Sequence, residues 1–477
     1  MIDDLVALMS CVDGRCSYAE ARRVTTVEQR AGVRNGRVEV ASHDETDGVG
    51  VRVRVGGAWG FAGTRDTTRA GAEAALSRAI ALAAAQPSAA DRPRSEEPPA
   101  TGHWTHPIER DPTSVPLDEK LALLGAAEEA LRSDRRIVRS DAAASATKVV
   151  QAFASTEGAA YTQERTTCGA GIAAVAVDGG ELQVRTYPTS HGGHVALAGW
   201  EHVLALDLVE HAPRVAAEAV ELLTAPPCPS GRSTIVLHPE QVALQVHESV
   251  GHALELDRIL LGEAAYAGTS WVQPEDLGSL RYGSEHMTIT ADATLPEGLG
   301  TFGWDDEGTP AHRTTLVEGG VLRAALSDRE AAAAVGARSA ACSRATSFDR
   351  QPIVRMTNVS LDPGDAGSLA DLIADTGEGL YLETNRSWSI DDKRVDFQFG
   401  TQWGREIRNG KLGRVLRNGT YAGRTTSFWG SMDAVGGPEL WKAWGLPNCG
   451  KGQPPQIGFV AHGAAPARFR DVRVGVR

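Results

Sequence analysis

The sequence predicts an α+β protein in which an N-terminal α+β domain is followed by a mostly β C-terminal domain. Two observations lead to this class. Tight turn dipeptides recur between segments of alternating apolar and polar residues, and helical patterns interrupt these segments. A proline-rich break at residues 226–231 divides the chain, so we expect domains at residues 1–225 and 232–477.

Four turns predict antiparallel hairpins. Glycine and asparagine tolerate the positive φ angles that two-residue turns require, so such pairs between extended segments favour a hairpin. The turns are Asn35-Gly36, Gly56-Gly57, Asp178-Gly179-Gly180 and Asn409-Gly410. Much of the chain is therefore predicted to form antiparallel sheet.

Helical patterns lie between these extended segments. Residues 67–85 are rich in alanine, and four leucines within residues 117–133 fall on one helix face. Residues 200–224 predict two helical pieces, in which Pro213 suits a first turn. Residues 86–116 hold seven prolines and mixed charges, which predicts a loop or solvated linker inside the first domain.

The charge and the ends of the chain exclude several classes of partner. The 477 residues include 61 Asp and Glu against 48 Lys and Arg, a net charge of −13. Such a surface repels phosphate backbones and anionic lipids, which argues against a nucleic-acid or membrane-surface role. No apolar run reaches the roughly 18 residues that span a bilayer. The start Met1-Ile2-Asp3-Asp4 has the wrong charge for a signal peptide, and six cysteines are too sparse for a disulfide scaffold. We therefore expect a cytoplasmic protein.

One helix near the start of the second domain carries the motif His247-Glu248-Ser249-Val250-Gly251-His252. Two imidazoles flanking a glutamate on a helix are how zinc hydrolases hold a metal and a general base together. In the common motif the histidines are four residues apart. Here they are five apart, which leaves them about 140° apart on a regular α-helix. A π-type turn, or a break at Gly251, would bring both rings to one ion.

The motif alone leaves the third ligand open. Candidates are carboxylates downstream or a distant cysteine or histidine; the carboxylates are Glu255, Asp257, Glu263 and Glu275. Cys449 lies in a glycine-rich segment, and a thiolate beside glycine can approach a metal closely in a mixed Cys/His site. The competing interpretation is a helix with two unrelated histidines, and a Cys449 that is a small buried loop residue.

The segment His247–Glu255 resembles the metal motif of the TldD/PmbA family of metallopeptidases. Three more segments agree with that family in order, and they are Asp305–Pro310, Arg355–Asn358 and Cys449–Lys451. Four ordered motifs are much more specific than one. The resemblance covers most of the second domain, whereas the first domain matches in length and general α+β character.

The resemblance implies one divalent metal ion, zinc with iron as the alternative, held by His247, His252 and Cys449. It also implies that Glu248 is the general base. Because the motif is intact, the chain resembles the metal-bearing TldD-like subunit. Members of the family form dimers, often heterodimers with a motif-less PmbA/TldE-like subunit.

These residue types predict a metal-dependent hydrolase in which activated water attacks the carbonyl of a peptide or a small amide. One alternative is an N-deacylase of a natural-product intermediate that uses the same site. Another is a non-catalytic scaffold subunit that contains a metal. An intact Glu248 argues against the scaffold, because a structural metal site needs no base.

Two further segments carry expectations about the site. The acidic turn Asp305-Asp306-Glu307 would be a solvated loop in an arbitrary sequence. The family resemblance instead implies that this turn binds substrate in the cleft or supports a metal ligand. His191 and His194 could bind metal, but their loop setting predicts surface histidines.

Overall fold

The computed structural model describes residues 1–12, 14–87, 92–264 and 268–475. These residues are 23% helix and 42% strand, and the predicted α+β class is confirmed. Residues 88–91 of the predicted proline-rich loop lie outside the described residues. The short strand β4 (Thr101–Thr105) forms within the rest of that segment.

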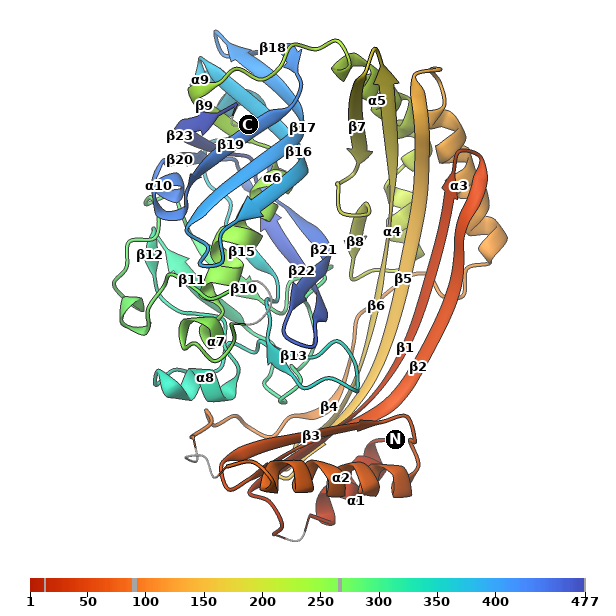
Figure 1. Ribbon diagram of the computed structural model, residues 1–477, viewed down its shortest axis with the longest axis vertical. Coiled ribbons are helices and arrows are strands. Elements are labelled where there is room, and N and C mark those ends of the chain that lie inside the picture. Colours follow the sequence, from red (N-terminus) through yellow and green to blue (C-terminus); the bar gives the residue numbers. More distant parts are fainter. Residues whose placement is uncertain (13, 88–91, 265–267, 476–477) are drawn as a thin grey trace.

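The proposed N-terminal domain is built on one sheet, which has eight strands among the described residues, in the order β3-β2-β1-β5-β6-β4 with β7 and β8 also paired to β6. Its four longest strands contain 17 to 19 residues each and run along one side of the molecule (Figure 1). The strands besides β4 are β1 (Tyr18–Arg34), β2 (Arg37–Val55), β3 (Ala58–Thr64), β5 (Ile137–Ser155), β6 (Ala160–Asp178), β7 (Glu181–Tyr187) and β8 (His194–Ala196).

The four predicted hairpin turns are confirmed. Asn35 and Gly36 join β1 to β2 with φ angles of 47° and 73°, the left-handed conformation that these residues tolerate. The other three turns join β2 to β3, β6 to β7, and β17 (Asp396–Arg408) to β18 (Lys411–Leu416). Local backbone preference therefore determines the connections of both domains.

Helices cover both ends of the N-terminal sheet. One helix packs against β2 and β3, a second packs beside it against β1 and β5, and three others cover β5 and β6 at the other end (Figure 1). They are α1 (Ile2–Ser10), α2 (Arg69–Ala84), α3 (Leu117–Leu131), α4 (Trp200–Ala205) and α5 (Leu208–Leu222). The first-turn position predicted for Pro213 is wrong, because α5 begins at Leu208 directly after Asp207, whose φ is 47°. The described residues contain no helix long and apolar enough to cross a membrane.

The proposed C-terminal domain contains two larger sheets. One follows the order β16-β9-β23-β19-β17-β18 with β20 paired to β23, and the other follows β12-β11-β10-β15. The strands of the first, besides β17 and β18, are β9 (Gly231–Leu237), β16 (Gly379–Ile390), β19 (Gly419–Arg424), β20 (Met432–Val435) and β23 (Ala467–Val474). Those of the second are β10 (Ile289–Asp292), β11 (Arg313–Glu318), β12 (Val321–Leu322) and β15 (Val359–Leu361).

Two hairpins and a buried helix complete this domain. Helix α6 (Pro239–Val246) has all eight of its residues buried and packs against β15, β16 and β22. The hairpins pair β13 (Ser343–Arg344) with β14 (Ile353–Val354), and β21 (Lys442–Lys451) with β22 (Gln456–Ala464). The remaining helices are α7 (Leu256–Ile259), α8 (Arg329–Ala334), α9 (Leu369–Thr376) and α10 (Thr425–Gly430). Figure 1 shows β21 and β22 on the side of this domain that faces the long strands.

A buried group of charges joins the two domains. Arg52 of β2 donates to the carboxylate of Glu307 at 2.6 Å and lies 2.8 Å from that of Glu20, and all three side chains are at most 5% exposed. Arg22 lies 3.3 Å from the Asp306 carboxylate. The acidic turn of the C-terminal domain is therefore held by arginines of the N-terminal sheet.

We expect Arg52→Met to destabilise the protein by about 3–5 kcal/mol, because it leaves two buried carboxylates without their cation. Denaturant unfolding followed by tryptophan fluorescence measures the change. Arg323→Met is the matched control, since Arg323 pairs with Glu318 at the surface and such pairs contribute at most about 1 kcal/mol. Equal stability of the two variants would contradict this role for Arg52.

Candidate metal centre

The helix that carries the motif changes its winding at the first histidine. Helix α6 ends at Val246, and residues His247–Gly251 form a π-helical turn before the 3₁₀ turn His252–Leu254. The backbone N–H of His252 donates to the carbonyl of His247, five residues back. The two rings consequently lie with their centroids 4.7 Å apart. The predicted π-type turn is confirmed, and it removes the difficulty of the five-residue spacing.

Ser249 supplies hydrogen bonds that this wider turn needs. Its hydroxyl donates to the Gln245 carbonyl at 2.7 Å and accepts from the Trp429 indole at 2.9 Å. The Tyr282 hydroxyl donates to the Ser249 carbonyl at 2.6 Å. Because a π turn displaces backbone groups from their usual α-helical partners, side chains must satisfy them in a buried setting. A Cβ at Gly251 would lie 2.2 Å from the Met356 sulfur, so a larger residue there would require this buried side chain to move.

Cys449 of β21 lies beside the two histidines. Its Sγ is 3.6 Å from His252 Nε2, and one ligand atom from each of His247, His252 and Cys449 lies within 4.8 Å of the others. Two imidazole nitrogens and a thiolate at these separations fit the ligand set of one zinc-like ion, whose bonds are about 2.0–2.3 Å long. Within the described part of the chain, the carboxylates of Glu263 and Glu275 do not join this group.

His462 determines which nitrogen of His247 is free. His462 Nδ1 lies 2.7 Å from the carbonyl of Val359, so it must donate and leave Nε2 as an acceptor. That Nε2 lies 2.8 Å from His247 Nδ1, which therefore carries the proton. Burial lowers the pKa of His462 well below its ordinary value and that of His247 to about 4, so both rings are neutral. His247 thus presents an unprotonated Nε2, as a metal ligand must.

Glu255 orients the second histidine. Its carboxylate lies 3.1 Å from His252 Nδ1 and accepts from Arg258 Nε at 2.7 Å. Burial alone would raise the pKa of Glu255, but Lys451, His252 and Arg258 hold it well below the ordinary value. Lys451 also binds Asp257 at 2.7 Å. Glu255 and Asp257, both considered as ligands, are therefore occupied by hydrogen bonds and ion pairs behind the site.

Arg355 lies directly behind Cys449. Its guanidinium donates to the carbonyl of Cys449 and, at 2.8 Å, to that of Gln456. Burial would raise the pKa of the Cys449 thiol, but Arg355 and His252 lower it below its ordinary value. This environment favours the thiolate, the form that binds a metal.

Glu248 follows the first histidine and makes few contacts. Its side chain is 10% exposed, and its Oε2 lies 3.9 Å from Arg394 Nη1. The carboxylate is thus partly accessible beside a cation, in contrast to the fully engaged Glu255.

The acidic turn Asp305-Asp306-Glu307 is buried. It therefore does not form the solvated loop that such residues would form in an arbitrary sequence. Asp305 accepts from the backbone N–H groups of Glu307, Thr309 and Ser343. Asp306 accepts from Gln151 and from the Ala345 backbone, both at 2.7 Å. Asp305 and Asp306 line a cavity between the domains, while Glu307 binds Arg52. Substrate binding by this turn stays a prediction.

The expectation of surface histidines at positions 191 and 194 is wrong. His194 is 4% exposed and hydrogen-bonds through Nε2 to the Ala443 carbonyl at 2.9 Å. His191 lines the cavity between the domains, and burial together with His247 lowers its pKa to about 4. Glycine at position 193 allows this loop to pack closely against β6, because a Cβ there would lie 2.0 Å from the Ala170 carbonyl oxygen.

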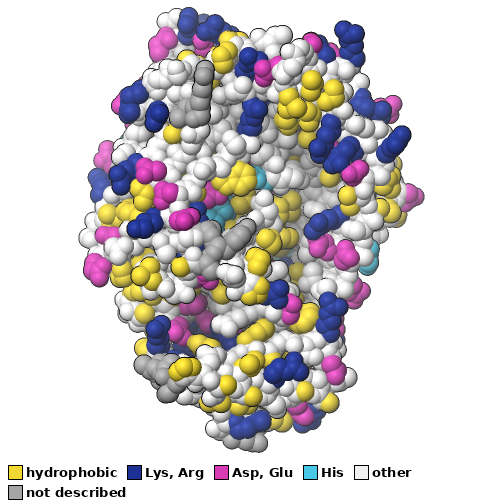
Figure 2. Space-filling model, in the orientation of Figure 1, with side chains coloured by type: hydrophobic (Ala, Val, Ile, Leu, Met, Phe, Trp, Pro, Cys, Tyr) yellow, Lys and Arg dark blue, Asp and Glu magenta, His cyan; other side chains and the backbone are white. Residues whose placement is uncertain are grey.

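The cavity beside the site has a volume of about 510 Å³. One wall is the face of β1, β5 and β6 opposite to the helices, and the other is formed by residues of the C-terminal domain, including the β21–β22 hairpin. Figure 2 shows that the surface of the molecule is hollowed between the two domains, with histidine side chains near the centre of the view. The volume suits a small ligand or a few residues of a peptide.

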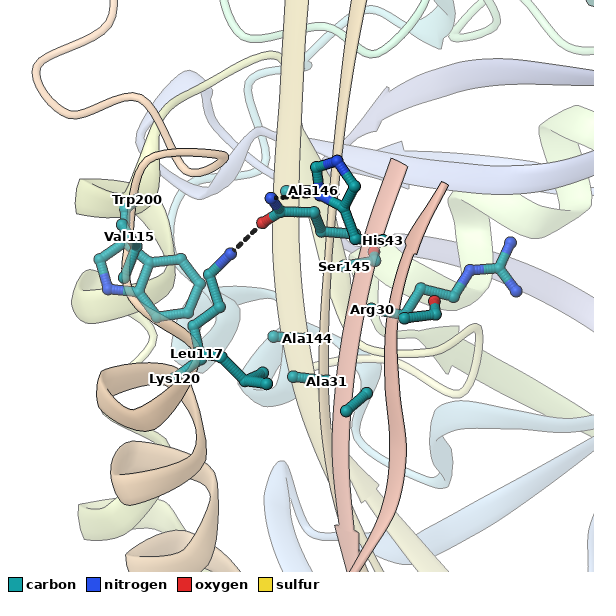
Figure 3. A pocket seen from close by; sticks show the side chains of 13 residues that line it. Arg30, Ala31, His43, Val115, Leu117, Lys120, Ala144, Ser145, Ala146 and Trp200 are labelled. Carbon is teal, nitrogen blue, oxygen red and sulfur yellow. Dashed lines mark hydrogen bonds between the residues drawn. The ribbon is translucent and has the colours of Figure 1, made fainter. Parts of the chain in front are cut away.

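A second cavity of about 260 Å³ lies in the N-terminal domain between the sheet and α3 (Figure 3). Lys120 donates to Gln29, and the Gln29 amide in turn lies 3.0 Å from His43 Nδ1. The indole Nε1 of Trp200, which also lines this cavity, is buried without a hydrogen-bond partner among the described residues. The residues of the metal centre are not among the lining.

Three models of one family match the chain. They are described as PmbA/TldA metallopeptidase domain 1, central domain and C-terminal domain, and they match residues 19–83, 110–225 and 230–475. A metalloprotease of Methanothermobacter thermautotrophicus is 31% identical over 474 residues, which cover 99% of this chain and 98% of that protein. A zinc metalloprotease TldD homolog of Saccharolobus solfataricus is 28% identical over 52% of each chain.

The fold also matches a solved structure. TldE from Thermococcus kodakarensis aligns with a TM-score of 0.77 at 15% sequence identity, covering 99% of this chain and 100% of that one. At this identity the likeness shows a common fold.

We expect His462→Ala to weaken zinc binding about 10–100-fold, because His247 Nδ1 loses the acceptor that keeps Nε2 free. Competition with a chromophoric chelator measures the dissociation constant. His286→Ala, at an exposed position, is the matched control and should bind as the parent does. An unchanged constant in His462→Ala would show that the hydrogen bond does not orient a ligand.

Proposed function

The chain belongs to the PmbA/TldD metallopeptidase family, and from this premise we propose that it hydrolyses peptide bonds with one zinc ion held by His247, His252 and Cys449. The close grouping of these three buried side chains carries the proposal. Two imidazoles and a thiolate suit zinc, and the zinc metalloprotease among the relatives supports that choice. Iron is the alternative, since imidazole also binds iron well.

Glu248 is the group that moves protons in the proposed reaction. When held by His247, His252 and Cys449, the ion would supply Lewis-acid chemistry. Glu248 takes a proton from the attacking water as its oxygen bonds to the substrate carbonyl carbon. It then gives that proton to the amine nitrogen as the carbon–nitrogen bond breaks. Arg394 attracts the carboxylate from 3.9 Å and limits its orientations.

The residues behind the ligands keep the site ready for this chemistry. His462 and Glu255 hold the Nδ1 protons of the two histidines, so that both Nε2 atoms point to the same place. The three ligands are at most 4% exposed, which limits the access of water to the site. The chain's own residues thus fix orientation before a substrate arrives.

Two related functions differ in substrate or partner. The N-deacylase alternative uses the same residues on a small amide, and the cavity of about 510 Å³ is large enough for one. We favour peptides because relatives over nearly the whole chain are named metalloproteases.

We further propose that the chain acts as a dimer, with a motif-less TldE-like subunit as partner, which the shared fold with TldE supports. The scaffold alternative leaves Glu248 without a role.

Glu248→Gln should retain the metal and lose activity on an extended peptide about 10²–10⁴-fold, because the amide cannot accept the proton. Turnover is measured with a fluorogenic peptide, and metal content with elemental analysis of the same sample. Glu439→Gln, at an exposed position, is the control and should keep full activity. Full activity of metal-loaded Glu248→Gln would refute the assignment of the base and favour the scaffold.

Elemental analysis of the purified protein should find one equivalent of metal, and Cys449→Ala and His252→Ala should each lose it. Cys228→Ala removes a partly buried thiol outside the group and should keep the metal. Metal that survives in Cys449→Ala would require another third ligand. A parent protein without metal after reconstitution would mean that the site is completed only by a partner.

A further inference from the structure

Several arginines line the cavity between the domains, and two of them, Arg165 and Arg344, have no role in the proposed chemistry. Arg165 lies on β6 between Gln163 and Thr167, and all three line the cavity because alternate residues of a strand share one face. Arg344 of β13 and Arg355, just after β14, line it from the C-terminal domain. The two domains thus direct cations into one space.

These arginines line the same cavity, so their charges act on one another. Burial lowers the pKa of Arg344 to about 9, and the charges of Arg165 and Arg355 add to this effect, which Asp306 partly offsets. Repulsion between buried like charges is unfavourable unless an anion compensates for it. We call Arg165, Arg344 and Arg355 the arginine group.

The carboxylates of the cavity are already occupied. Glu28 binds Arg30 at 2.8 Å, and Asp306 binds Arg22 of the sheet. Asp305 accepts from three backbone N–H groups and, among the described residues, pairs with no arginine of the cavity.

Arg165 has no counter-ion of its own. Within the described residues its side chain makes no hydrogen bond or ion pair. Burial lowers the pKa of Arg165, and Asp306, which partly offsets this, is already paired with Arg22. Arg344 donates to the Met356 carbonyl at 2.8 Å, and Arg355 donates to two carbonyls. Arg355 also lies beside the Cys449 thiol, and Asp306, which is already paired with Arg22, attracts Arg344. Arg165 is therefore the member of the group whose side chain has no hydrogen-bonded partner among the described residues.

We propose that the arginine group binds a carboxylate of the peptide substrate, either its C-terminus or an acidic side chain. A guanidinium forks two N–H donors toward the two oxygens of a carboxylate, which makes arginine the preferred partner for this group. Arg355 donates to the carbonyl of Cys449, so the arginine group adjoins the proposed metal ligand. The inference rests on the proposed function and narrows its substrates to anionic peptides.

The test uses three peptides that share one sequence. The first ends in a free carboxylate, the second in a C-terminal amide, and the third has the amide and one internal glutamate in place of glutamine. We expect kcat/KM to exceed that of the neutral amide about 10–100-fold for at least one anionic peptide, the range of a charge-assisted hydrogen bond. The peptide that gains identifies the source of the carboxylate.

Variants assign that selectivity to the cavity. Arg165→Gln should reduce the ratio of anionic to neutral peptide at least about tenfold, and Arg165→Lys should restore part of it by keeping the charge. Arg408→Gln is the matched control, because Arg408 is 66% exposed on β17 and lies outside the cavity lining. Thermal melting verifies that each variant is folded.

Binding separates this inference from the proposed function. The dissociation constants of fluorescein-labelled versions of the three peptides are measured by anisotropy on Glu248→Gln. If Glu248→Gln binds the anionic peptides selectively and the parent protein hydrolyses none of the peptides, the result would support anion recognition and refute peptidase activity. Hydrolysis without selectivity, selectivity that Arg165→Gln retains, or no binding of any peptide would each overturn the inference.

Discussion

The π turn at His247–Gly251 is the constraint on which the rest of the site depends. It places residues five apart on one face, and it exists only where side chains replace the backbone hydrogen bonds that an α-helix would supply. Ser249 contacts Gln245, Trp429 and Tyr282, which come from three separate parts of the C-terminal domain. The winding of one turn is thereby coupled to the packing of the whole domain core. Local sequence alone, with glycine in mid-helix, would not maintain it.

The end of β21 serves the site through the alternation of a strand. Cys449 and Lys451 are two residues apart, so they point to the same side. Cys449 reaches His252, while Lys451 lies 3.5 Å from Glu255, the carboxylate that orients His252. Lys451 is fully buried, and with Arg258 it compensates the charges of Glu255 and Asp257. One short segment therefore supplies a candidate ligand, Cys449. It also supplies Lys451, the cation that balances the carboxylates behind the other ligand, His252.

Features that depend on neighbouring residues were predictable, whereas those that depend on distant ones were not. Asn35-Gly36 encodes its own turn, and the five-residue spacing of His247 and His252 indicated a wider helical turn because no regular helix could use both rings. His462 gave no signal, since it lies 215 residues from the ring that it orients. The acidic turn looked like a solvated loop because its partners are as far away as Arg52, 255 residues earlier. His191 was assigned to the surface, yet the Gly192-Gly193 pair after it was the available sign of a close backbone approach.

The buried charges between the domains also limit how the protein can move. The turn Asp305-Asp306-Glu307 forms part of the cavity and at the same time joins the C-terminal domain to Arg22 and Arg52 of the sheet. A clamshell opening about this edge would separate buried ions, which costs several kcal/mol for each. A substrate of the proposed reaction would therefore enter a cavity that is already formed, and not one that a hinge closes over it. With a volume of about 510 Å³, this cavity has room for a few residues of an extended chain and not for a folded domain.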